Sequence, residues 1–166
     1  MRKLLILAAA LLSAACAEAP QPEINVIPRP LSVEQGDGAF RLGRSCPIGY
    51  DDPALQSVAA LCAGYLTEEG ERKPVVADKP VHKGIDLQLD DTLAGEEYTL
   101  SATKKGVSIC GGSPRAVLYG VQTLRQLLPA AAFGAGRVKA VELPAVVVED
   151  RPGKSKKQHP QNSMKP

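Results

Sequence analysis

The most constraining feature of the sequence is strict alternation of apolar and polar residues in two separate segments. One segment runs from Ile85 to Leu89 and the other from Tyr98 to Ala102. Alternation places successive side chains on opposite faces of a strand, so one face is buried while the other meets water. A third segment, Val107–Cys110, follows a turn at Lys104-Lys105-Gly106. The three segments predict half-buried strands of an antiparallel sheet.

Two helices are predicted to cover this sheet. The first begins at Asp51-Asp52-Pro53, where an acidic N-cap precedes a proline, and the second begins with Ser113 as N-cap and Pro114 as its first residue. Apolar residues recur at helical spacing after each start, which predicts one buried face per helix. The predicted buried residues are Leu55, Val58, Leu61, Cys62 and Tyr65 in the first helix, and Val117, Val121, Leu124 and Leu128 in the second.

The remaining apolar runs complete the expected fold. Ile24–Ile27 is a short β-type run, and Leu31–Val33 is expected to form a hairpin with Ala39–Leu42 around the Gly36-Asp37-Gly38 turn. Ala145–Val148 is the last strand. The chain has no Trp and few other aromatic residues, so Val, Leu, Ile and Ala must build the core. The order of elements predicts an α+β sandwich in which two helices cover one antiparallel sheet.

The N-terminus is typical of an exported precursor. Residues 1–15 combine a basic start with a short apolar run, which is too short for the roughly 20 residues that span a bilayer. Small residues precede Cys16, which favours lipidation of that cysteine, and cleavage at an A-x-A-type site is the alternative. Residues 16–23 then form a tether. We expect a periplasmic protein or a lipoprotein anchored to the outer membrane.

The charge of the chain is unevenly distributed. All 18 acidic residues lie between Glu18 and Asp150, whereas seven of the 20 basic residues lie near the N-terminus or after Asp150. The body therefore holds 13 basic residues and a net charge of about −5, so the pI of about 8.3 does not indicate nucleic-acid binding. Residues 153–166 are basic and Pro-bearing, which predicts a disordered tail, and residues 24–152 are left as one domain.

Few residues offer catalytic chemistry. The two histidines, His82 and His159, cannot form an H-E-x-x-H motif, and no G-x-S-x-G elbow is present. Gly111-Gly112-Ser113-Pro114 is interpreted as a turn from strand to helix rather than as a phosphate-binding loop. The acidic pairs are interpreted as caps and solvated turns; they are Asp51-Asp52, Glu68-Glu69, Asp90-Asp91 and Glu96-Glu97. We therefore predict no catalytic, cofactor-binding or metal-binding residue.

Three cysteines remain in the body, namely Cys46, Cys62 and Cys110. They have no C-x-x-C spacing, so small buried side chains are favoured over redox or metal chemistry. A disulfide from Cys46 to either of the others stays open. The scarcity of aromatic residues also argues against a sugar-binding groove in this domain.

Two parts of the chain resemble the family 20 glycoside hydrolases, the β-N-acetylhexosaminidases. The segment Ile24-Asn25-Val26-Ile27-Pro28-Arg29-Pro30, with Gly38–Leu42, resembles their opening. The stronger match runs from Glu97-Tyr98-Thr99-Leu100 to the helix Tyr119-Gly120-Val121-Gln122-Thr123-Leu124-Arg125-Gln126-Leu127-Leu128, and it is similar to the end of their N-terminal accessory domain. Leu143–Pro152 resembles the strand and linker that precede the catalytic barrel.

The resemblance implies that catalysis belongs to another domain. In this family a (β/α)8 barrel carries a Glu acid/base and an Asp that orients the substrate's own acetamido nucleophile. The sequence after Pro152 departs from the family's R-F-x-x-R-G-x-H-L-D stretch, so no catalytic residue is carried over. We expect a truncated hexosaminidase, inactive alone, whose accessory domain has the barrel as its partner. The alternatives are a free-standing exported binding module and, resting on the cysteines alone, an unrelated metal or redox protein.

Overall fold

The computed structural model describes residues 24–68, 73–129 and 140–151. Within them it has seven strands, two α-helices and one 3-10 turn, η1 (Pro53–Leu55). The helices are α1 (Gln56–Glu68) and α2 (Pro114–Leu127). The strands are β1 (Ser32–Gly43), β2 (Pro47–Tyr50), β3 (Val75–Ala77), β4 (Ile85–Leu89), β5 (Tyr98–Thr103), β6 (Gly106–Gly111) and β7 (Ala140–Asp150).

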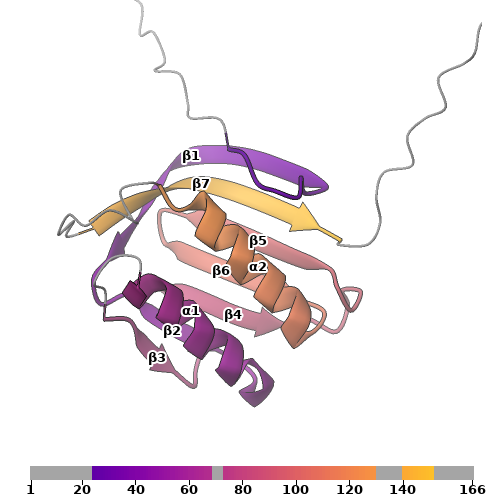
Figure 1. Ribbon diagram of the computed structural model, residues 1–166, viewed down its shortest axis with the longest axis horizontal. Coiled ribbons are helices and arrows are strands. Elements are labelled where there is room, and N and C mark those ends of the chain that lie inside the picture. Colours follow the sequence, from indigo (N-terminus) through magenta and orange to yellow (C-terminus); the bar gives the residue numbers. More distant parts are fainter. Residues whose placement is uncertain (1–23, 69–72, 130–139, 152–166) are drawn as a thin grey trace, which may run out of the picture.

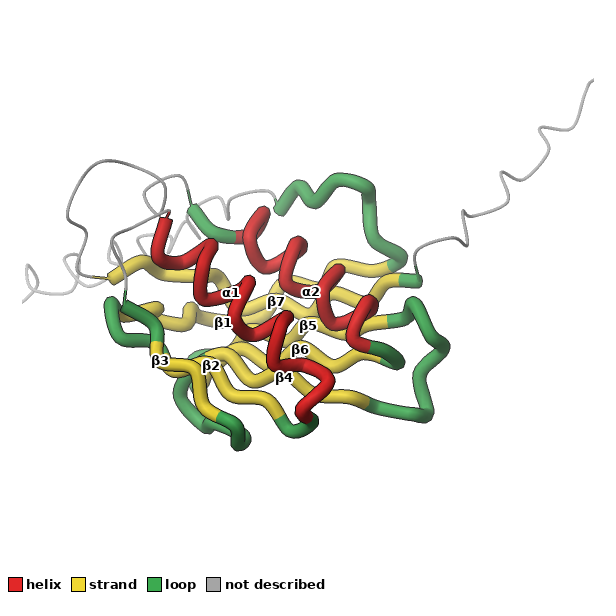
Figure 2. Tube along the Cα trace, turned by 60° about the horizontal axis from the view of Figure 1, so that its bottom comes forward, coloured by secondary structure: helices red, strands yellow, loops and turns green. Residues whose placement is uncertain are grey.

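All seven strands form one sheet, in the order β1-β7-β5-β6-β4-β2-β3. Both helices lie side by side on the same face of this sheet (Figures 1 and 2). On the opposite face the described residues place no helix. Thr99, Ser101 and Ser108 belong to that face, because they alternate along their strands with the buried residues. The predicted α+β fold, in which two helices cover one sheet, is therefore confirmed.

The sheet is mixed, however, and the expectation that it is antiparallel throughout is wrong for one half. β4 runs parallel to both β2 and β6, and β3 runs parallel to β2. The other half, β1-β7-β5-β6, is antiparallel. Alternation reports which face of a strand is covered and carries no information about the direction of its neighbours. The helix α1 connects β2 to β3 as a crossover, which is the connection that parallel strands require.

The hairpin expected around Gly36-Asp37-Gly38 does not form. These residues lie within the continuous strand β1, which pairs with β7 along its length. The register shifts between Gln35, opposite Val146, and Ala39, opposite Pro144, so β1 carries two more residues than its partner there. Proline has no N–H for the ladder, and Gly38 adopts a φ of 92°, which together favour a bulge at this point.

Both predicted helix starts are confirmed. The Asp52 carboxylate accepts a hydrogen bond from Ala54 N at 2.8 Å, and Ser113 Oγ accepts one from Ala116 N at 3.2 Å. All four residues predicted for the buried stripe of α2 are buried. In α1 the prediction is wrong at Leu61, which is 39% exposed, because the buried stripe runs instead through Val58, Ala59, Cys62 and Leu66.

The core lies between the helices and the sheet and consists of aliphatic side chains, as predicted. Its largest side chains with less than 2% exposure are Ile48, Leu55, Ile85, Leu87, Leu100, Ile109, Leu143, Val117, Val121, Val146 and Val148. Burial of each such side chain contributes roughly 1.5–3 kcal/mol. One core on one face of the sheet makes the domain a single rigid unit, and the helices form its outer layer.

Several predictions concern residues outside the described ranges. These are the signal sequence 1–15, the tether 16–23 with the lipidation site Cys16, and the tail 153–166. None of the helices in the described part of the chain is long and apolar enough to span a bilayer.

Candidate functional site

Two of the acidic residues predicted to serve caps and turns do so, namely Asp52 and Asp90. Asp52 caps the first helical turn, and Asp90 accepts hydrogen bonds from Thr92 N and Oγ, which lower the pKa of Asp90. Asp86 is the buried carboxylate of the described domain, and it accepts hydrogen bonds from Val81 N at 3.1 Å and Gln88 Nε2 at 2.6 Å. A glycosidase normally needs two facing carboxyl groups, and no second one faces Asp86 in these contacts.

The Gly111–Pro114 segment is the predicted turn from strand to helix. A side chain at Gly112 would lie 2.2 Å from the carbonyl oxygen of Ala94, so the glycine is needed for a close backbone approach. Ser113 Oγ also donates a hydrogen bond to the Gly95 carbonyl. Among the described residues, no three His, Cys, Asp or Glu side chains gather as a metal ion would require.

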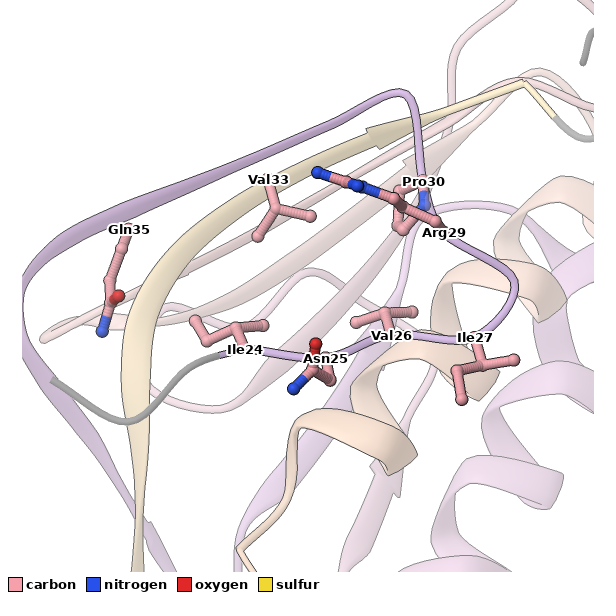
Figure 3. A pocket seen from close by; sticks show the side chains of 8 residues that line it. All are labelled: Ile24, Asn25, Val26, Ile27, Arg29, Pro30, Val33 and Gln35. Carbon is pink, nitrogen blue, oxygen red and sulfur yellow. The ribbon is translucent and has the colours of Figure 1, made fainter. Parts of the chain in front are cut away.

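A cleft of about 560 Å³ separates the N-terminal segment from the start of β1 (Figure 3). Side chains of Ile24, Val26 and Val33 face it, together with the polar Asn25 and Gln35. Among the described residues that line it, Arg29 is the ionisable side chain and none is a carboxylate. These residues do not supply the groups for acid–base catalysis.

None of the three cysteines of the described domain forms a disulfide there. Cys46 and Cys62 lie in the core, as expected of small buried side chains, and Cys110 is partly exposed. Burial raises the pKa of Cys62 to about 12, with a smaller contribution from Cys46, and burial also raises the pKa of Cys110. Cys62 and Cys110 are therefore protonated at neutral pH and are poor nucleophiles.

The helix α2, which carries the strongest family resemblance, is fixed tightly to the sheet. A Cβ at Gly120 would lie 2.4 Å from Ile109 Cγ2 and 3.2 Å from Tyr98 Cδ2, so no larger residue fits at this contact. Beside it, the hydroxyls of Thr123 and Tyr98 share a buried hydrogen bond of 2.6 Å. Burial raises the pKa of Tyr98, which keeps this phenol neutral.

Two glutamines of α2 join it to other parts of the domain. Gln122 Nε2 donates to Tyr65 Oη on α1 at 2.8 Å, and Arg125 lies 4.9 Å from the centre of the same ring. Gln126 binds the backbone of Ile27 twice, since its Oε1 accepts from Ile27 N at 2.8 Å and its Nε2 donates to Ile27 O at 3.0 Å. The segment Ile24–Ile27 is thus held by a side chain and is not the strand that its sequence predicted.

The exit of the chain from the domain is also fixed. Asp150, at the end of β7, lies opposite Tyr98 in the sheet. The next residue, Arg151, forms an ion pair of 2.6 Å with Glu97, whose side chain is 16% exposed. The pairing of Tyr98 with Asp150 and the ion pair of Glu97 with Arg151 therefore fix the chain at the end of β7.

The outer surface of α1 is unusual because it is almost uncharged. Residues 56–67 of α1 include no Asp, Glu, Lys or Arg, although a surface helix normally carries charge on its solvent side. We call this surface the outer helix face and define it by Ala60, Leu61 and Gly64 of α1 with Leu118 of α2. Leu61 is 39% exposed, and no atom lies within 4 Å of a Cβ built on Gly64.

Comparison with known proteins assigns the domain. Residues 23–151 match the family model for glycosyl hydrolase family 20, domain 2. The chain belongs to glycosyl hydrolase family 20. Among curated relatives of the family, it is 31% identical over 134 residues to a beta-hexosaminidase of Porphyromonas gingivalis, and the match covers 78% of this chain and 17% of that protein.

Solved structures of family 20 agree. The N-acetyl-beta-hexosaminidase of Streptomyces plicatus is 33% identical, with a TM-score of 0.69 over 80% of this chain and 27% of that one. The family 20 beta-N-acetylhexosaminidase of Streptomyces coelicolor A3(2) is 34% identical, with a TM-score of 0.67 over 77% of this chain and 26% of that one. The chain thus spans about a quarter of these structures, and the described residues constitute an accessory domain of family 20.

The family 20 motif on α2 is therefore a set of internal contacts. Gly120 and Thr123 contact the sheet, Gln122 contacts α1, and Gln126 contacts the N-terminal segment. The sequence predicted α2 and its buried stripe but not the partners of the two glutamines, which lie 57 and 99 residues away along the chain. The sequence signal for these contacts is that both glutamines flank the buried stripe of α2.

We expect Thr123→Val to destabilise the domain by about 1–3 kcal/mol, because it leaves the buried Tyr98 hydroxyl without its partner. The double variant with Tyr98→Phe should cost less than the sum of the single changes. Urea unfolding measures both effects. Thr67→Val is the matched control, since Thr67 is exposed and bonds only to Ala63 O within α1. Equal costs at both threonines, with additive effects in the double variant, would contradict the assignment.

Proposed function

We propose that this chain provides the accessory domain of a β-N-acetylhexosaminidase and does not hydrolyse glycosides by itself. The observation that carries the proposal is that polar residues of the family motif form contacts within the domain. Each polar motif residue of α2 described above has a partner inside the domain, so none is available to a substrate. The carboxylates of the described residues serve turns, caps and exposed or internal contacts. The role of the domain is then structural.

Catalysis in this family, as the resemblance implies, uses the 2-acetamido group of the substrate as nucleophile, with an Asp to orient it and a Glu as acid/base. Such a mechanism requires two carboxyl groups around one sugar. The described residues that line the cleft of Figure 3 offer no such pair. The hexosaminidase activity would accordingly reside in a (β/α)8 barrel.

The outer helix face is the surface that we assign to contact with the barrel. A (β/α)8 barrel is surrounded by helices, so its partner must pack against a helical surface. Small residues such as Ala60 and Gly64 permit close approach of a second helix, and Leu61 supplies an apolar side chain to bury. The absence of charge from residues 56–67 removes the desolvation cost that such a contact would otherwise carry.

A chimera tests this assignment. In it, residues 24–151 replace the corresponding domain of the Streptomyces plicatus enzyme, which is 33% identical over this region. We expect Leu61→Asp to lower the yield of active chimera at least severalfold, because it buries an unpaired carboxylate at the interface. Release of nitrophenol from a chromogenic N-acetylglucosaminide is the measurement.

The matched control is Val76→Asp, because Val76 on β3 is 40% exposed, almost the same as Leu61. This variant should leave the chimera active. Both substitutions should change the Tm of the separate chain little, since both sites are exposed there. Equal losses from the two variants would contradict docking through the outer helix face, and an inactive chimera with the unchanged domain would contradict the accessory role itself.

We also propose that the domain is exported and anchored by lipid on Cys16. The basic start and apolar run of residues 1–15 support export, and the small residues before Cys16 support lipidation. Cys16→Ser should release the protein from the membrane fraction of expressing cells. Equal recovery of both forms in that fraction would contradict the lipid anchor.

A further inference from the structure

Four basic side chains line one pocket at the end of the sheet. The pocket holds about 500 Å³ and lies where the end of β1, the start of β2 and the turn between β5 and β6 meet. Its charged lining consists of Arg41, Lys83, Lys104 and Lys105. Phe40 and Pro47 supply apolar wall, and none of the described residues that line the pocket is acidic. We call this site the basic pocket.

The four cations of the basic pocket form no ion pair with an acidic side chain of the described residues. Glu142, the cross-strand neighbour of Arg41, lies beside it in the sheet and offsets part of its charge. The body as a whole carries a net charge of about −5. Four exposed cations in one lining create a local positive potential that attracts an anion.

The stem of one lysine packs against the backbone of β1. Lys104 lies over Gly38, where a Cβ would meet Lys104 Cε at 2.1 Å. Gly38 adopts a φ of 92°, a conformation that favours glycine, within the bulge of β1. The bulge thus leaves room for the Lys104 side chain beside the pocket.

We propose that the basic pocket binds the anionic group of a charged glycan, such as a sulfated N-acetylhexosamine. The proposal rests on the accessory role given above, which places the domain on an enzyme that acts on N-acetylhexosamine residues. The volume suits a small ligand, and the planar guanidinium of Arg41 can bind two sulfate oxygens at once. The apolar wall of Phe40 and Pro47 can contact a sugar ring.

Other anions fit the pocket less well. A nucleic acid would bring many phosphates against a body of net negative charge, and only four cations would oppose that repulsion. An isolated inorganic anion would not use the apolar wall. No sequence pattern indicates this site. The scarcity of aromatic residues argues against sugar contact through stacking, whereas recognition here depends on charge.

The test is calorimetric titration of the purified chain with three probes: N-acetylglucosamine 6-sulfate, unsulfated N-acetylglucosamine and inorganic sulfate. We expect the sulfated sugar to bind about tenfold or more tightly than either of the others. The double variant Lys83→Gln/Lys104→Gln should weaken its binding by about tenfold or more. Added salt should also weaken it, because the attraction is electrostatic.

The control is Lys79→Gln/Arg115→Gln, which removes the same charge from two exposed residues that do not line the basic pocket. It should leave binding unchanged. Equal weakening by both double variants, equal binding of the three probes, or absence of binding by the sulfated sugar would overturn the proposal. Tighter binding of a short single-stranded oligonucleotide through Lys83 and Lys104 would overturn it as well. The outcome of this titration does not depend on the activity of the chimera, so the anion site and the accessory role are tested separately.

Discussion

The close contact between α2 and the sheet at Gly120 is the constraint on which the rest of the structure depends. It brings the helix so near to β5 and β6 that Thr123 can reach the hydroxyl of Tyr98. From that position the two glutamines of α2 reach α1 on one side and the N-terminal segment on the other. A motif that identifies family 20 is thus explained by packing and internal hydrogen bonds, which is what a rigid accessory domain requires.

One-sided cover of the sheet divides the surface of the domain into regions of different chemistry. The helix α1 presents an apolar, nearly uncharged surface around Leu61, whereas the uncovered face of the sheet is polar. The basic pocket lies at one end of the strands and is distinct from both. Such a distribution allows one face to pack against another domain while the rest meets solvent or ligand.

The sequence predicted the features that depend on local chemistry. Asp52 and Ser113 were found as caps because their side chains act on residues two or three positions later, and the buried stripe of α2 followed from its spacing. Strand direction was not predictable, since alternation is the same in parallel and antiparallel neighbours. The sequence predicts a turn where β1 has its bulge, because Gly36 and Gly38 are compatible with a turn and with a bulge. The basic pocket joins Arg41 to Lys105 across 64 positions of the sequence, which no local pattern reveals.

The central claim is that the domain supports catalysis without performing it. The most direct test is release of nitrophenol from 4-nitrophenyl N-acetyl-β-glucosaminide by the purified chain. The account predicts no rate above the uncatalysed background, because the described residues that line the cleft of Figure 3 include no carboxyl group. Turnover that persists through purification and is abolished by Asp86→Asn, which removes the buried carboxylate, would contradict it.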